Sequence, residues 1–104
     1  MDQFIVNDLK QYFSSKPVNK AYLFGSFARN EFKNESDIDI LVELRKEAKV
    51  DLFEFIKMKL DLESLLKKPI DLLSAKGISK HIKSKVDEEK ILIYEKSKLM
   101  NQLD

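Results

Sequence analysis

The side chains best suited to chemistry lie in the segment from Gly25 to Asp39, which reads GSFARNEFKNESDID. A Gly-Ser pair closes a short apolar run, and ten residues later Asp37 and Asp39 follow with one residue between them. Because alternate residues of a strand point to the same face, these two carboxylates are expected to lie side by side. Oxygen ligands in this arrangement suit hard divalent cations such as Mg²⁺, and can bridge two of them.

The Gly-Ser turn predicts an anion site opposite the two acids. A helix that begins near Ser26 offers free backbone N–H groups to a phosphate, and the Ser26 hydroxyl can add a hydrogen bond. A triphosphate held there would present its α-phosphorus for in-line attack. Asp71, on a separate short strand, is the candidate third metal ligand and general base. Arg29 is a candidate phosphate ligand, with a surface role on a short helix as the alternative.

Hydrophobic patterning predicts four helices that alternate with four strands. The helices are expected at residues 4–13, 26–28, 51–66 and 79–88, and the strands at residues 20–24, 38–44, 70–73 and 91–94. This order predicts an α/β (α+β) domain with a small mixed β-sheet of about four strands and helices packed on one face. The other face of the sheet, which carries Asp37 and Asp39, is expected to open to solvent as an acidic floor.

The longest helix, residues 51–66, is expected to begin at a capping Asp51 and to bury a broad apolar face. The residues assigned to that face are Leu52, Phe55, Ile56, Leu60 and Leu62. The aromatic residues Phe53, Phe55 and Tyr22 are interpreted as core residues.

Length and composition indicate one ordinary globular domain, with residues 1–95 forming the domain and residues 96–104 a C-terminal tail. The absence of cysteine excludes disulfides and thiolate metal sites. No apolar run is long enough for a bilayer and no signal-peptide pattern is found, so a cytoplasmic location without membrane contact is expected. Six lysines and one acid lie between residues 67 and 85, which indicates a solvated face or an electropositive rim for a nucleotide or partner.

The spacing Gly25-Ser26, ten residues, Asp37-Ile38-Asp39 resembles the G-S-x(10)-D-x-D motif of the nucleotidyltransferase superfamily that includes DNA polymerase beta. Residues 69–73 resemble the later strand that carries that family's third carboxylate. The resemblance implies the nucleotidyltransferase fold, with Asp37 and Asp39 holding two Mg²⁺ ions, Asp71 holding one of them, and the Gly-Ser pair holding the triphosphate of ATP. Family members often have Gly where this chain has Asn30, a residue type that tolerates left-handed backbone angles.

The small size is similar to that of the minimal nucleotidyltransferases, which often act as antitoxins of HEPN-domain toxins and transfer AMP from ATP onto the toxin. The resemblance implies a Mg²⁺-dependent transferase with a toxin as its partner, in which a hydroxyl of the toxin is the acceptor, an RNA acceptor being left open. Homo- or hetero-oligomers are both compatible with it. The alternatives are a binding module that neutralises its partner by occlusion, and the catalytic subunit of a larger aminoglycoside- or RNA-modifying nucleotidyltransferase.

Overall fold

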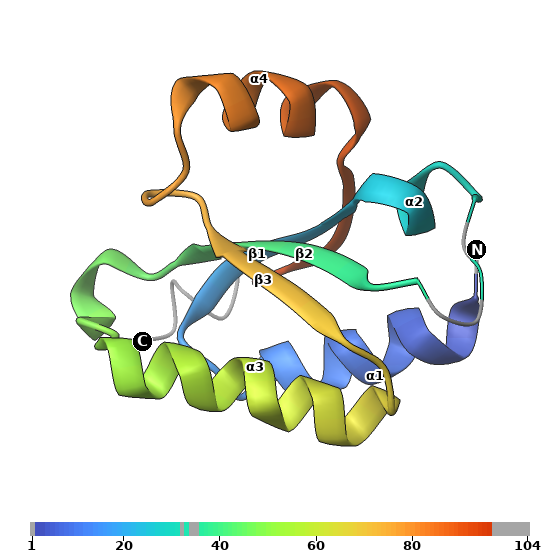
Figure 1. The fold of residues 1–104 in the computed structure, drawn as a ribbon. Helices are drawn as coiled ribbons and strands as arrows, with labels where there is room; N and C mark the ends of the chain where they lie inside the picture. The colour runs from blue at the N-terminus through green and yellow to red at the C-terminus, as the bar shows by residue number, and fades with distance from the viewer. Residues whose placement is uncertain (1, 32, 34–35, 97–104) are drawn as a thin grey trace.

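The computed structural model describes residues 2–31, 33 and 36–96, and in this part of the chain it has the predicted alternation of helices and strands (Figure 1). The elements are α1 (Gln3–Ser14), β1 (Val18–Phe24), α2 (Gly25–Ala28), β2 (Ile38–Leu44), the 3₁₀ turn η1 (Lys46–Ala48), α3 (Leu52–Leu66), β3 (Ile70–Ser74), α4 (Lys80–Glu89) and β4 (Ile91–Glu95). The predicted tail lies, beyond Lys96, outside the described residues. None of the described helices has the length and apolar character needed to cross a membrane.

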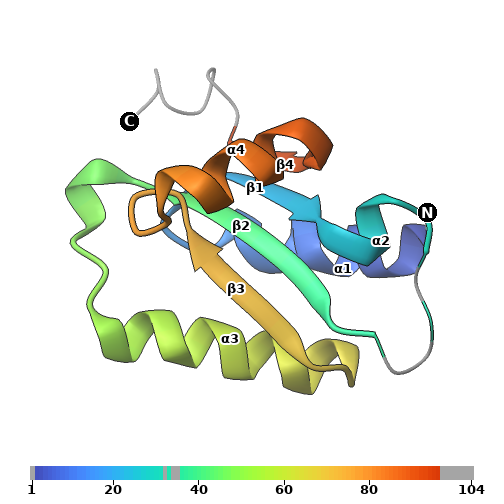
Figure 2. The ribbon, with the colours of Figure 1, turned by 45° about the horizontal axis from the view of Figure 1, so that its top comes forward.

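The four strands form one mixed sheet in the order β3-β2-β1-β4. Strand β1 pairs antiparallel with both β2 and β4, whereas β2 and β3 are parallel. A parallel pair needs a crossover, and α3 supplies it by running along one face of the sheet (Figure 2). The parallel register sets Asp39 directly opposite Asp71. The α/β class and the small mixed sheet of four strands were predicted correctly.

The helices cover both faces of the sheet, which corrects the prediction that they pack on one face. Helices α1 and α3 lie on one side and α4 on the other (Figure 1). The main core is formed by residues such as Leu9, Phe13, Leu23, Ile38, Ile40 and Leu62. On the opposite face Val86 of α4 packs against Phe24 and Leu41 in a second, smaller cluster. This face carries apolar side chains beside its acids, and burying them requires the cover that α4 provides.

The predicted ends of α3 are confirmed, and its predicted buried face is confirmed at Phe55 and Leu62 but wrong at Leu52, Ile56 and Leu60. The Asp51 side chain accepts a hydrogen bond from the Glu54 backbone N–H at 2.8 Å, as an N-cap should. Only Met58 and Leu62 are buried on this helix, because α3 packs mainly on β3 and α1 along a narrow stripe. Its exposed large apolar residues are Leu52, Phe53, Ile56, Leu60 and Leu65. Phe53, with 82% of its surface exposed, is therefore not a core residue.

Candidate active site

The structure places Asp39 and Asp71 side by side near the starts of two neighbouring strands, and Asp37 directly precedes one of these strands. Asp39 and Asp71 are register partners across the parallel pair, so their side chains lie on the same face of the sheet. The charges of Asp71 and Asp37 both act on the Asp39 carboxyl group. Asp39 is half-buried, while Asp37 and Asp71 are exposed. The arrangement is a cluster of carboxylates that remains open to solvent on one side.

Burial and electrostatic repulsion together raise the pKa of Asp39. Burial, followed by the charges of Asp71 and Asp37 and then that of Glu89, raises the pKa of Asp39 to about 6. A bound divalent cation would offset this repulsion, because it favours the ionised form of every carboxylate around it.

The carboxylates of this cluster suit a metal ion that takes its remaining ligands from oxygen atoms of the substrate. Among the described residues, no group of three or more His, Cys, Asp or Glu side chains is placed as a preformed metal cage. Mg²⁺ is usually held by one or two carboxylates together with waters and phosphates, so the paired carboxyl groups of Asp39 and Asp71 suit it. The assignment of Asp37, Asp39 and Asp71 as metal ligands and catalytic acids stays a prediction.

The Gly-Ser turn lies directly against this cluster. Strand β1 ends at Phe24 and α2 begins at Gly25, whose φ of +69° is in the left-handed region that favours glycine. A Cβ atom at Gly25 would overlap Oδ2 of Asp39. Glycine is therefore required both by the backbone angle and by the close approach to Asp39. Asn30 also has a left-handed φ, of 59°, at the position where glycine is usual in the resembled family.

We expect Gly25→Ala to lower stability and nucleotide binding far more than Gly77→Ala does. The left-handed angle alone costs a non-glycine residue about 1–2 kcal/mol, and the overlap with Asp39 adds to that. Denaturant unfolding and binding of an ATP analogue would measure the two losses. Gly77→Ala is the matched control, since its added Cβ would meet only the Ser74 carbonyl oxygen at 3.8 Å. Wild-type stability and binding in Gly25→Ala would contradict the proposed contact.

Arg29 lies beside the turn and is held by two carboxylates. Its Nη1 donates to Oε2 of Glu89 at 2.8 Å, and its Nε donates to Oε2 of Glu31 at 3.1 Å. Ser26, the second residue of α2, is half-buried. The structure therefore places all three predicted nucleotide ligands on one short segment next to the acids. Their contact with a nucleotide stays a prediction.

Glu89 is a site residue that the sequence-based reasoning missed. Its Oε1 accepts a hydrogen bond from the Gly25 backbone N–H at 2.9 Å, although 64 residues separate the two in the chain. No local motif marks Glu89, and the predicted helix ends one residue before it. One signal was available: an acid at the C-terminal end of a helix is unfavourable for the helix dipole, so it needs a partner elsewhere.

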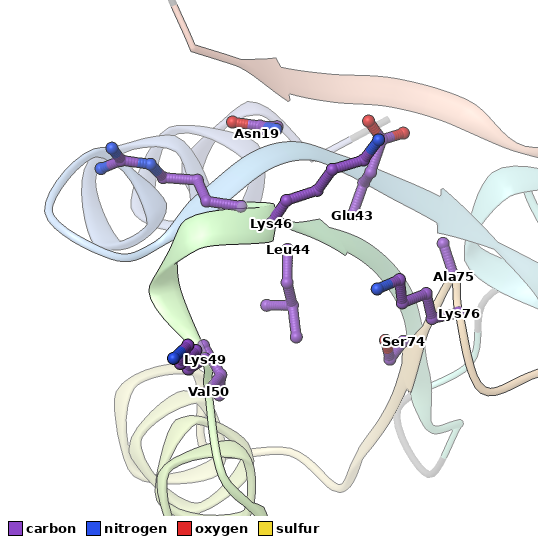
Figure 3. Close-up of a pocket in the computed structure, with 10 residues that line it drawn as sticks. Asn19, Glu43, Leu44, Lys46, Lys49, Val50, Ser74, Ala75 and Lys76 are labelled. Carbon is purple, nitrogen blue, oxygen red and sulfur yellow. The ribbon is translucent and has the colours of Figure 1, made fainter.

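A separate cavity of about 420 Å³ lies at the far end of β2 from the acids (Figure 3). We call it the basic pocket. Its lining residues are Asn19, Glu43, Leu44, Arg45, Lys46, Lys49, Val50, Ser74, Ala75 and Lys76. It contains none of the predicted site residues, so it is not part of the candidate active site.

The chain is similar in sequence to known nucleotidyltransferases. The family described as Polymerase beta, Nucleotidyltransferase matches residues 7–99. Over 74 residues the chain is 42% identical to "Putative protein adenylyltransferase MJ0435" of Methanocaldococcus jannaschii, which covers 71% of this chain and 77% of that protein.

Two solved structures share the fold. A toxin–antitoxin crystal structure with AMP-PNP matches with a TM-score of 0.73 and 20% identity, covering 99% of this chain and 80% of that chain. A complex of a tri-AMPylated HEPN toxin from Shewanella oneidensis with an MNT antitoxin matches with a TM-score of 0.71 and 21% identity, covering 99% and 79%. At these sequence identities the two similarities show a shared fold and nothing more.

Proposed function

The chain belongs to the polymerase beta nucleotidyltransferase family, and on this basis we propose that it transfers AMP from ATP to a hydroxyl of a partner protein. The observation that carries the proposal is the meeting of Asp39, Asp71 and Gly25, which joins a carboxylate pair to a turn suited to phosphate. The names of its relatives support adenylyl transfer as the reaction. AMP-PNP in a structural neighbour supports ATP as the nucleotide.

In the proposed reaction the chain's residues position both reactants. The Gly25-Ser26 turn, through the Ser26 N–H and hydroxyl, and the Arg29 guanidinium bind the triphosphate, while the Gly25 N–H donates to Glu89. Asp71 accepts the proton of the acceptor hydroxyl. The hydroxyl oxygen bonds to the α-phosphorus while the bond between this phosphorus and the bridging oxygen breaks, and pyrophosphate leaves.

The cofactor in this proposal is Mg²⁺, bound as two ions. Asp37 and Asp39 would hold both ions and Asp71 one of them. When bound, the ions would neutralise phosphate charge and make the acceptor hydroxyl easier to deprotonate. Hard carboxylate oxygens are the donors that such an ion prefers, and the described carboxylate pair offers them.

The proposed partner is a HEPN-type toxin that presents the acceptor hydroxyl in trans, so the working assembly would be a hetero-oligomer with this chain as the antitoxin. Support comes from a structural neighbour that is a complex of an AMPylated HEPN toxin with an MNT antitoxin. The names of the relatives mention a protein acceptor and no RNA. The test below distinguishes the two kinds of acceptor.

The test is incubation with ATP labelled at the α-phosphate, Mg²⁺ and a candidate HEPN protein. Label is expected on a hydroxyl-bearing side chain of the partner, with one pyrophosphate released per label. Neutralisation of the partner without label would instead favour the occlusion alternative, and label on RNA would overturn the protein acceptor. Glu43→Gln is a control variant that is expected to keep activity. Glu43 is an acid on the same strand as Asp39, but it lies four residues further along and therefore away from the site.

A further inference from the structure

We propose that Glu89 is a positioning residue that holds the Gly-Ser turn and Arg29 in place for the nucleotide. The inference rests on the proposed function and adds a residue to that site. Glu89 is the last residue of α4, and it reaches across to α2. Through Glu89, α4 contacts both Gly25 and Arg29 and so fixes their positions, although it is distant from them in the sequence.

Both carboxylate oxygens of Glu89 are used by candidate nucleotide ligands. Oε1 accepts from the Gly25 N–H at 2.9 Å and Oε2 from Arg29 Nη1 at 2.8 Å. The side chain of Glu89 is 18% exposed and its contact with Gly25 is partly buried between the helices, whereas its contact with Arg29 faces solvent. The ion pair with Arg29 holds the pKa of Glu89 below its usual value, which keeps the carboxylate charged.

Gly25 lies between Glu89 and the acid cluster. On one side its Cα is so close to Asp39 that no Cβ would fit, and its N–H is bound by Glu89. The N–H bond also helps to fix the left-handed backbone angle of Gly25. Loss of Glu89 would therefore leave the turn free to move relative to Asp39, and a phosphate bound there would lose its alignment.

The Glu89 carboxylate also orients the Arg29 side chain. A guanidinium group carries five N–H donors in a rigid fork, and the described contacts with Glu89 and Glu31 use two of its nitrogens. These contacts fix the plane of the fork. The remaining donors can then meet a phosphate oxygen without the entropy cost of ordering a long side chain.

The same contacts could instead mean that Glu89 competes with phosphate for Gly25 and Arg29. The two roles predict opposite effects: removing a competitor tightens nucleotide binding, whereas removing a positioning residue weakens it. The geometry favours positioning, because displacing Glu89 would break two charge-assisted hydrogen bonds of a partly buried carboxylate.

The experiment compares Glu89→Ala and Glu89→Gln with Glu88→Ala, the neighbouring exposed acid on α4. For Glu89→Ala, KM for ATP is expected to rise about 10- to 100-fold, the range for losing hydrogen bonds to charged groups, with a smaller fall in kcat. Glu89→Gln keeps an oxygen for the Gly25 N–H but loses the charge facing Arg29, so partial rescue is expected. Glu88→Ala should stay within about twofold of wild type.

Binding of AMP-PNP with Mg²⁺, measured by calorimetry without any acceptor, separates the outcomes. Unchanged or tighter binding in the Glu89 variants, with an active wild type, would overturn the positioning role alone. Failure of the wild type itself to bind AMP-PNP and to transfer AMP would overturn the proposed function and this inference with it. Thermal unfolding checks that the variants are folded, and if Glu89→Ala is not, Glu89→Gln decides.

Discussion

Asp39→Asn is expected to lower the rate of AMP transfer by at least about 1,000-fold, because cation binding supplies several kcal/mol of transition-state stabilisation in such reactions. Asparagine keeps the shape of the side chain but removes one anionic oxygen at the centre of the cluster. Transfer of α-phosphate label from ATP to the partner is the measurement. Activity within tenfold of wild type would contradict the role of Asp39.

The same substitution is expected to stabilise the metal-free protein. The folded-state pKa of Asp39, about 6, lies above its ordinary value of 3.8, so the ionised carboxylate opposes folding at neutral pH. Wild-type stability should therefore fall as pH rises from about 4 to 6, and this component should be missing in Asp39→Asn. Thermal unfolding in a chelating buffer measures it. Glu43→Gln, on the same strand, should show neither the loss of transfer nor the gain in stability.

The elements and the acid motif could be predicted because their signals are local. The Asp51 cap is set by residues within one helical turn, and strand β2 was predicted at its observed bounds from its apolar alternation. The proximity of Asp39 and Asp71 was also expected, since a nucleotide site needs a third acid. Their direct register, however, follows from the parallel pairing of β2 with β3, which one sequence does not specify.

The features that escaped prediction depend on contacts between distant segments. The face that carries Asp37 and Asp39 was expected to open to solvent, but Val86 of α4 packs against Leu41 there. Leu52, Ile56 and Leu60 were expected in the core, yet they are 68%, 43% and 56% exposed because α3 has neighbours along one stripe only. An apolar periodicity shows which helix face can be buried, but the number of neighbouring elements decides how much of that face is buried.

Removal of divalent cations is expected to reduce AMP transfer to background, and excess Mg²⁺ should restore it. Without a cation the repulsion among Asp37, Asp39 and Asp71 would oppose the approach of a triphosphate, which is itself strongly anionic. Chelation followed by Mg²⁺ titration of the labelling assay measures this dependence. Full transfer in the presence of chelator would contradict a cation-dependent reaction.

The pH dependence of cation binding tests the same site without the nucleotide. A proton and Mg²⁺ compete for Asp39, so stabilisation of the fold by Mg²⁺ should weaken below about pH 6, where Asp39 is protonated. Raising the Mg²⁺ concentration should move this midpoint to lower pH, because the ion favours the carboxylate over the acid. Leaving ATP out of the measurement removes the titration of its own phosphates, which falls in the same pH range. Asp39→Asn has no proton to lose at this position, so a pH midpoint that persists in this variant would assign the titration to another group.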